Sequence, residues 1–107
     1  MLAFGALADP TRRVLLTRLA YGPATAGQLA ELAQISRPAV SQHVRVLREA
    51  GVVRGSRHGR FIWYELAGEN LIDAARWLDD LLELWTKAPT RRNPHEHSRE
   101  LRRAEQP

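Results

Sequence analysis

The chain has 107 residues, the length of one domain of common size, and no cysteine, so disulfides, thiolate metal sites and cysteine nucleophiles are excluded. Its formal net charge of +4 is unevenly distributed: residues 37–60 hold six arginines and a single acid, Glu49, whereas residues 61–85 are mainly acidic. We expect a cytoplasmic protein, since no apolar run approaches the roughly 20 residues that span a bilayer and the first five residues lack a basic n-region.

The first third of the chain predicts a short helical segment at residues 2–8 and two longer helices. Asp9 as N-cap and Pro10 at the first position start a helix that extends to about Tyr21, where Gly22 and Pro23 end it. Its buried side is expected to hold Val14, Leu15, Leu16 and Leu19. Thr25 and Gln28 match a capping box for the next helix. The inner face of that helix is expected to hold Leu29, Leu32 and Ala33.

Residues 36–51 predict a fourth helix with a basic outer side, begun by a Ser36 cap and ended by Gly51. Val40, Val44 and Leu47 have the spacing of a core-facing side. The outer side chains suit a DNA major groove, because Gln pairs with adenine and Arg with guanine. We predict base contacts from Ser41, Gln42 and Arg45, and contacts with the DNA backbone from Ser36, Arg37, His43 and Arg48.

Residues 52–54 and 61–66 predict two strands of a small hairpin. Four cations crowd it, and like charges so close repel one another unless an anion joins them. The DNA backbone or a narrow minor groove is therefore the predicted partner of Arg54, Arg57, His58 and Arg60. Trp63 and Tyr64 point to opposite faces of the return strand, so at least one should enter the core.

These elements predict a mainly α fold with a small β-hairpin: a winged helix-turn-helix of about five helices and a two-stranded wing. The last helix runs from Gly68 to about Lys87. From Pro89 onward the chain is polar, which predicts a domain at residues 1–88 for DNA binding and dimerisation and a disordered tail at 89–107.

The last helix carries two adjoining apolar stripes, more than one small domain needs. One has heptad spacing and consists of Leu71, Ala75, Leu78, Leu82 and Trp85; the other consists of Ala74, Trp77, Leu81 and Leu84. We expect one stripe to pack on its own domain and the other to meet a second copy of the chain. The predicted dimer interface consists of Leu2, Phe4 and the five heptad residues. The alternative is that one subunit buries the whole width.

Three parts of the chain are distinctive together: Ala6-Leu7-Ala8-Asp9-Pro10-Thr11-Arg12, the stretch from Ser36 to Val44 continued by Leu47-Arg48-Glu49-Ala50-Gly51, and Gly59-Arg60 with Tyr64 and Leu66. In these parts the chain resembles the ArsR/SmtB family of winged-helix repressors. The resemblance implies a homodimer built through its first and last helices. It also implies binding to an imperfect inverted repeat in double-stranded DNA, and repression of an operon that is often the repressor's own.

The resemblance also implies metal sensing in many members, but this chain lacks the thiolate pair of such sensors. Asp73 lies on the last helix without a following histidine, and His95 and His97 lie in the polar tail, so we predict no metal site and no cofactor, with the effector unknown. An enzyme is disfavoured, since the chain has no Gly-rich phosphate loop and no spaced Ser/His/Asp set. The alternative function is a winged-helix module whose basic helix docks an acidic protein.

Overall fold

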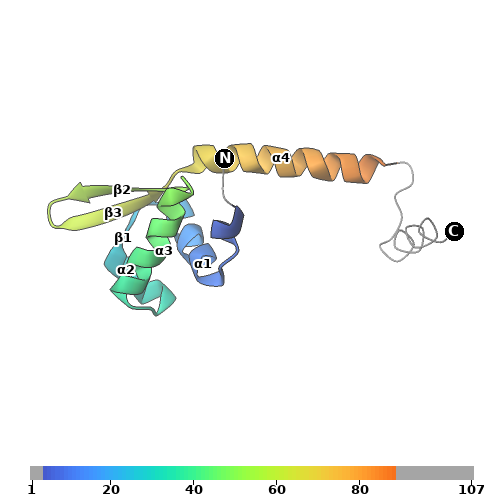
Figure 1. Cartoon of the computed structure of the whole chain (residues 1–107). Coiled ribbons are helices and arrows are strands. Elements are labelled where there is room, and N and C mark those ends of the chain that lie inside the picture. Colours follow the sequence, from blue (N-terminus) through green and yellow to red (C-terminus); the bar gives the residue numbers. More distant parts are fainter. Residues whose placement is uncertain (1–3, 89–107) are drawn as a thin grey trace. The chain divides into compact units, whose positions relative to one another are not determined.

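The computed structural model describes residues 4–88, which form helices, a small sheet and a long last helix (Figure 1). In chain order the elements are η1 (Phe4–Leu7), α1 (Pro10–Ala20), β1 (Ala24–Thr25), α2 (Ala26–Ala33), α3 (Arg37–Glu49), β2 (Val53–His58), β3 (Phe61–Leu66) and α4 (Gly68–Lys87). They fall into two units, residues 4–74 and 75–88. The predicted winged helix-turn-helix is confirmed, with η1 a short 3-10 helix in place of the first of five helices.

The helix starts follow from their capping residues. Asp9 accepts a hydrogen bond from the Arg12 amide at 2.9 Å. Thr25 and Gln28 exchange hydrogen bonds between side chain and backbone in the predicted capping box. Each cap satisfies an amide that the first helical turn leaves without a partner, which fixes where the helix begins.

A third strand joins the hairpin and was not predicted. The order in the sheet is β1-β3-β2, and β1 pairs antiparallel with β3 through Ala24 opposite Tyr64 and Thr25 opposite Trp63. Strand β1 has only two residues, too few for a period-two pattern to show. Strand β2 reaches His58, beyond the predicted limit at Arg54, because its paired residues continue to the turn.

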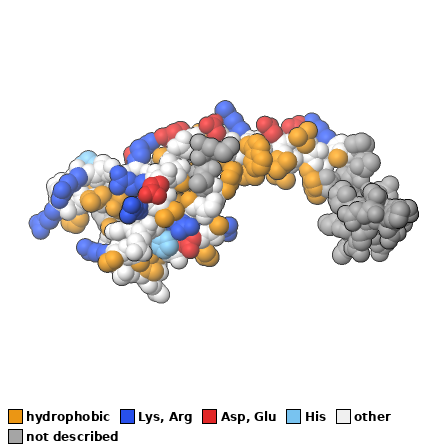
Figure 2. Space-filling view, viewed as in Figure 1, with side chains coloured by type: hydrophobic (Ala, Val, Ile, Leu, Met, Phe, Trp, Pro, Cys, Tyr) orange, Lys and Arg blue, Asp and Glu red, His pale blue; other side chains and the backbone are white. Residues whose placement is uncertain are grey.

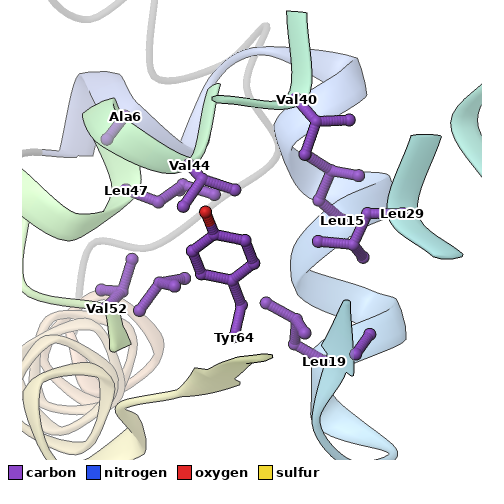
Figure 3. Packing of buried hydrophobic residues seen from close by; sticks show 11 residues of the cluster. Ala6, Leu15, Leu19, Leu29, Val40, Val44, Leu47, Val52 and Tyr64 are labelled. Atoms are coloured by element: carbon purple, nitrogen blue, oxygen red, sulfur yellow. The ribbon is translucent and has the colours of Figure 1, made fainter. Parts of the chain in front are cut away.

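The core lies between α1, α2, α3 and the sheet. Its fully buried side chains include Leu15, Leu29, Val40, Leu47 and Val52. Figure 3 shows the ring of Tyr64 among Val44, Leu47, Val52 and Leu19. Tyr64 is buried and Trp63 only partly so, which confirms that at least one of these aromatic residues enters the core.

Two residues predicted for the core are exposed instead. Val14 on α1 keeps 43% of its surface exposed and Leu32 on α2 keeps 52%. Leu15 and Leu29, both fully buried, fill the contact between α1 and α2 (Figure 3). Val14, next to Leu15 in the sequence, and Leu32, one turn after Leu29, therefore lie beside the core and remain exposed.

Candidate nucleic-acid interface

The orientation of α3 is fixed by its start and its inner side. Ser36 accepts a hydrogen bond from the Ala39 amide at 3.2 Å, and Pro38 lies in the first turn, where it sacrifices no helical hydrogen bond. Val40, Val44 and Leu47 are at most 2% exposed. Because these three face the core, the opposite side of the helix faces solvent over its whole length.

The exposed side of α3 carries all three residues predicted to contact bases. Ser41, Gln42 and Arg45 are exposed, and the Arg45 side chain retains 81% of its accessible surface. An open hollow of about 510 Å³ lies along this side and ends at β3; it is lined by Ser41, Val44, Arg45, Arg48, Glu49 and Tyr64. Polar and cationic groups thus stand on one helix face beside the hairpin, where a duplex would meet them together.

Glu49 also belongs to this face, a placement that was not predicted from the sequence. Its carboxylate accepts a hydrogen bond from Arg45 Nε at 3.2 Å, and its side chain is 67% exposed. The spacing of four residues along a helix is the signal that would have revealed this pair. Glu49 is therefore the ion-pair partner of Arg45 on this face.

Arg37 lies over the start of α2. A Cβ placed on Gly27 would come within 3.0 Å of Arg37 Nη2, so the guanidinium rests closely on that glycine. Gly27 thereby allows the approach of Arg37, a role that the sequence alone did not indicate.

His43 differs from the arginines of α3 because it is only partly exposed. Its Nδ1 is 3.9 Å from the Asp9 carboxylate, and its side chain is 23% exposed. The Arg12 amide, which donates to Asp9, lowers the pKa of that carboxyl, and the charges of Arg12 and His43 lower it further. His43 thus joins α3 to the start of α1.

The hairpin tip carries the remaining cations. The turn contains Gly59 at a φ of +62°, a conformation that glycine adopts without strain. Arg57, His58 and Arg60 are all exposed, and Ser56 Oγ lies 3.2 Å from His58 Nε2. Figure 2 shows Lys and Arg side chains gathered over the hairpin and α3 on the face in view.

Arg54 differs from the tip cations because two acids already engage it. Its guanidinium donates to Glu65 at 3.4 Å and to Glu69 in the first turn of α4. Hydrogen bonds from Arg54 to Glu69 and Glu65 raise the pKa of Arg54, while the Glu69 backbone amide and Arg54 lower the pKa of Glu69. The Asn70 side chain also donates to the Gly51 carbonyl. The base of the wing is therefore tied to the start of α4.

The apolar stripes of α4 are exposed beyond its first turns. Leu71 is partly buried and packs against the core, whereas Leu78, Leu82 and Trp85 are 43%, 57% and 49% exposed. Ala75 is exposed as well, and the second stripe includes Trp77, Leu81 and Leu84 at 56%, 47% and 72%. Among the other predicted interface residues, Phe4 is 44% exposed and Leu2 lies outside the described residues.

Within residues 4–88 there is no group of three or more His, Cys, Asp and Glu side chains that could hold a metal ion. Asp73 is exposed on α4, and the predicted tail with His95 and His97 lies outside the described residues. Over the same range, no helix is long and apolar enough to cross a membrane.

Comparisons with known proteins agree with this geometry. Residues 7–56 match the family described as a helix-turn-helix domain. The chain is 43% identical to the transcriptional repressor SdpR of Bacillus subtilis over 75 residues, covering 70% of this chain and 83% of SdpR. It is 44% identical to the HTH-type transcriptional regulator Rv2034 of Mycobacterium tuberculosis over 88 residues, covering 82% and 79%.

A solved structure is similar as well. The crystal structure of the ArsR family transcriptional regulator RHA00566 superposes with a TM-score of 0.70 and 37% identity, covering 78% of this chain and 87% of the other.

Proposed function

Because the chain belongs to the ArsR/SmtB family of winged helix-turn-helix transcriptional regulators, which are DNA-binding proteins rather than enzymes, we propose that it is a homodimeric repressor. It binds an inverted repeat in the promoter of its own operon and excludes polymerase. The observation that carries the proposal is the row of exposed polar and cationic side chains on α3 beside a cationic wing tip.

In this proposal α3 enters the major groove. Ser41, Gln42 and Arg45 contact base edges, since Gln and Arg present paired donors and acceptors to adenine and guanine. Ser36, Arg37 and Arg48 contact the DNA backbone, aided by the free amides at the start of α3. The half-buried position of His43 beside Asp9 supports a structural role for it instead.

The wing adds a contact that does not depend on sequence. Arg57, His58 and Arg60 approach phosphates or the minor groove, where their mutual repulsion is relieved. Arg54 stands in the same strand, but its ion pairs with Glu65 and Glu69 support a positioning role at the base of the wing.

The dimer forms through the apolar side of α4 together with Phe4 and Leu2. Exposed leucines at heptad spacing are the usual seam of a helix–helix contact, and a small domain gains buried area by pairing. Residues 1–88 then serve both DNA binding and dimerisation. The absence of cysteine and the lack of a metal cluster within residues 4–88 favour regulation by something other than a thiophilic ion.

Fluorescence anisotropy tests the proposal with DNA from upstream of the gene and scrambled DNA of equal length, at two salt concentrations. We expect tight binding to the upstream DNA, weaker at high salt, and unchanged by zinc or a chelator. Release of the DNA on addition of zinc would contradict the proposal that DNA binding does not depend on a metal. Equally weak binding to both DNAs would contradict self-repression and favour docking to an acidic protein.

A further inference from the structure

Glu49 is the single acid among six arginines in residues 37–60, and it is exposed on α3. An α-helix turns about 100° per residue, so Glu49 lies about 180° around the helix from the buried Val40. By the same turn it lies only about 40° from Arg45 and about 20° from Gln42, two residues assigned above to base contacts. Glu49 also lines the same hollow as Arg45. A duplex that meets those side chains therefore meets the Glu49 carboxylate as well.

Neither stability nor general affinity for DNA explains an acid at this place. The ion pair between Glu49 and Arg45 joins side chains that are 67% and 81% exposed, and pairs so exposed contribute little to stability. A carboxylate also repels phosphates, so it weakens contact with the DNA backbone. Such a charge can still favour one sequence over the others, because specificity is a difference between affinities.

The four bases differ in what they offer to a carboxylate, which only accepts hydrogen bonds. In the major groove cytosine presents an amino donor, whereas the polar atoms of guanine and thymine are acceptors. Adenine presents an amino donor beside the acceptor N7, which repels the second carboxylate oxygen. Cytosine is therefore the base whose edge suits Glu49 best.

The ion pair leaves Arg45 able to contact guanine at the same time. Arg45 Nε donates to Glu49 Oε1 at 3.2 Å. A guanidinium engaged through Nε can still donate from its two terminal nitrogens to O6 and N7 of guanine. The second oxygen of Glu49 can accept from an amino group close by. The pair thus presents two adjoining groups that suit a guanine and a neighbouring cytosine.

We infer that Glu49 is a specificity-determining residue of the DNA interface. It accepts a hydrogen bond from the amino group of a cytosine next to the guanine that Arg45 contacts, and it disfavours guanine and thymine at that position. The inference rests on the proposed function, in which α3 enters the major groove. It goes further by giving an acid, rather than a cation, a role in the choice of sequence.

Selection of bound DNA from a library of random duplexes tests the inference with the full chain, Glu49→Gln and Glu83→Gln. The last of these is a matched control, because Glu83 pairs with Lys87 four residues away on α4 and is 59% exposed. Both substitutions therefore remove one negative charge and one exposed ion pair, but only one of them lies on α3. Circular dichroism checks that both variants are folded.

The unmodified chain and Glu83→Gln should prefer cytosine at one position of each half-site by at least about tenfold. In Glu49→Gln that preference should fall to within about twofold, because an amide both donates and accepts and so tolerates guanine and thymine. The preference for guanine at the neighbouring position should persist. In anisotropy titrations at low salt, scrambled DNA should bind Glu49→Gln about threefold more tightly than Glu83→Gln, since a charge that repels phosphates is gone.

The inference is overturned if Glu49→Gln selects the same bases as Glu83→Gln, or if scrambled DNA binds the two variants equally. Loss of the guanine preference in place of the cytosine preference would overturn it too, because Glu49 would then act only through Arg45. A chain that selects no sequence overturns the proposed function and the inference with it. A selected sequence that Glu49→Gln leaves unchanged overturns the inference alone.

Discussion

At the scale of single residues, exposure and pairing divide the cations into two kinds. Arg45 pairs with Glu49 but keeps 81% of its side-chain surface exposed, and the tip arginines are exposed as well, whereas Arg54 pairs with two acids and His43 faces Asp9. The sequence could predict the outward side of α3, because Val40, Val44 and Leu47 mark the inward side. It could not predict the pair between Arg54 and Glu69, because Glu69 meets Arg54 only after the hairpin and α4 have folded together.

Arg45 and Arg57 should differ in how their loss affects DNA binding. Arg45→Ala removes a predicted base contact and should cost about 1–3 kcal/mol with relaxed sequence preference. Arg57→Ala removes a predicted phosphate contact, so it should weaken cognate and scrambled DNA alike and reduce the salt slope by about one. Anisotropy titrations over a salt series measure both. Unchanged affinity and unchanged preference in both variants would contradict this placement of α3 and the wing.

Arg54→Gln should affect stability in a way that depends on pH. The pKa of Glu69 is lowered in the folded protein, so its contribution is fully present above its ordinary pKa of 4.5 and is lost as the pH falls through the lowered value. We expect the variant to melt at a lower temperature near pH 7, and the difference to shrink below about pH 4.5. Thermal denaturation followed by circular dichroism measures it.

Arg57→Gln is the control for that experiment. It removes the same charge from the same strand, at a residue with no ion pair within residues 4–88, and should leave the melting temperature nearly unchanged. If Arg54→Gln instead lowers the salt slope of DNA binding as Arg57→Gln does, Arg54 contacts phosphate rather than positioning the wing.

At the scale of elements, local signals decided what could be predicted. The helix caps at Asp9, Thr25 and Ser36 depend on residues only three positions apart in the sequence, and all three are found as expected. Strand β1 escaped prediction because two residues gain strand conformation only by pairing with β3. Val14 and Leu32 were placed wrongly because apolar spacing shows which helix face is apolar, not how much of that face the neighbouring helix covers.

The capping box of α2 gives a prediction at this scale. Thr25→Ala removes the acceptor of the Gln28 amide and should lower the free energy of unfolding by about 1 kcal/mol. Urea denaturation measures the loss. Thr11→Ala is the control, since Thr11 lies inside α1 and caps no helix, and it should change stability by less than about 0.5 kcal/mol. Equal losses in the two variants would show that the cap contributes nothing beyond a generic threonine truncation.

At the scale of the whole molecule, α4 carries the proposed assembly. Figure 2 shows apolar side chains along one side of this helix and charged ones along another. The sequence predicted both stripes but not their burial, because a heptad pattern describes the helix face and not the partner that covers it.

A charge in the seam should separate the subunits. Leu82 is 57% exposed in the single chain and lies in the proposed seam. The substitution Leu82→Glu places a carboxylate there, and the cost of desolvating that carboxylate should oppose dimer formation. Arg76→Gln lowers the net charge by the same one unit outside both stripes, so it should leave the dimer intact. Sedimentation equilibrium measures the mass of each. A monomeric unmodified chain, or a Leu82→Glu dimer as stable as the unmodified one, would contradict the seam.

The central claim is that a dimer places two copies of α3 in successive major grooves of one operator. Hydroxyl-radical footprinting of the upstream DNA tests it directly. We predict two protected stretches related by the symmetry of an inverted repeat, with centres about one helical turn, roughly 34–36 Å, apart or a multiple of that distance. A single protected stretch, or even protection along the whole fragment, would contradict the claim.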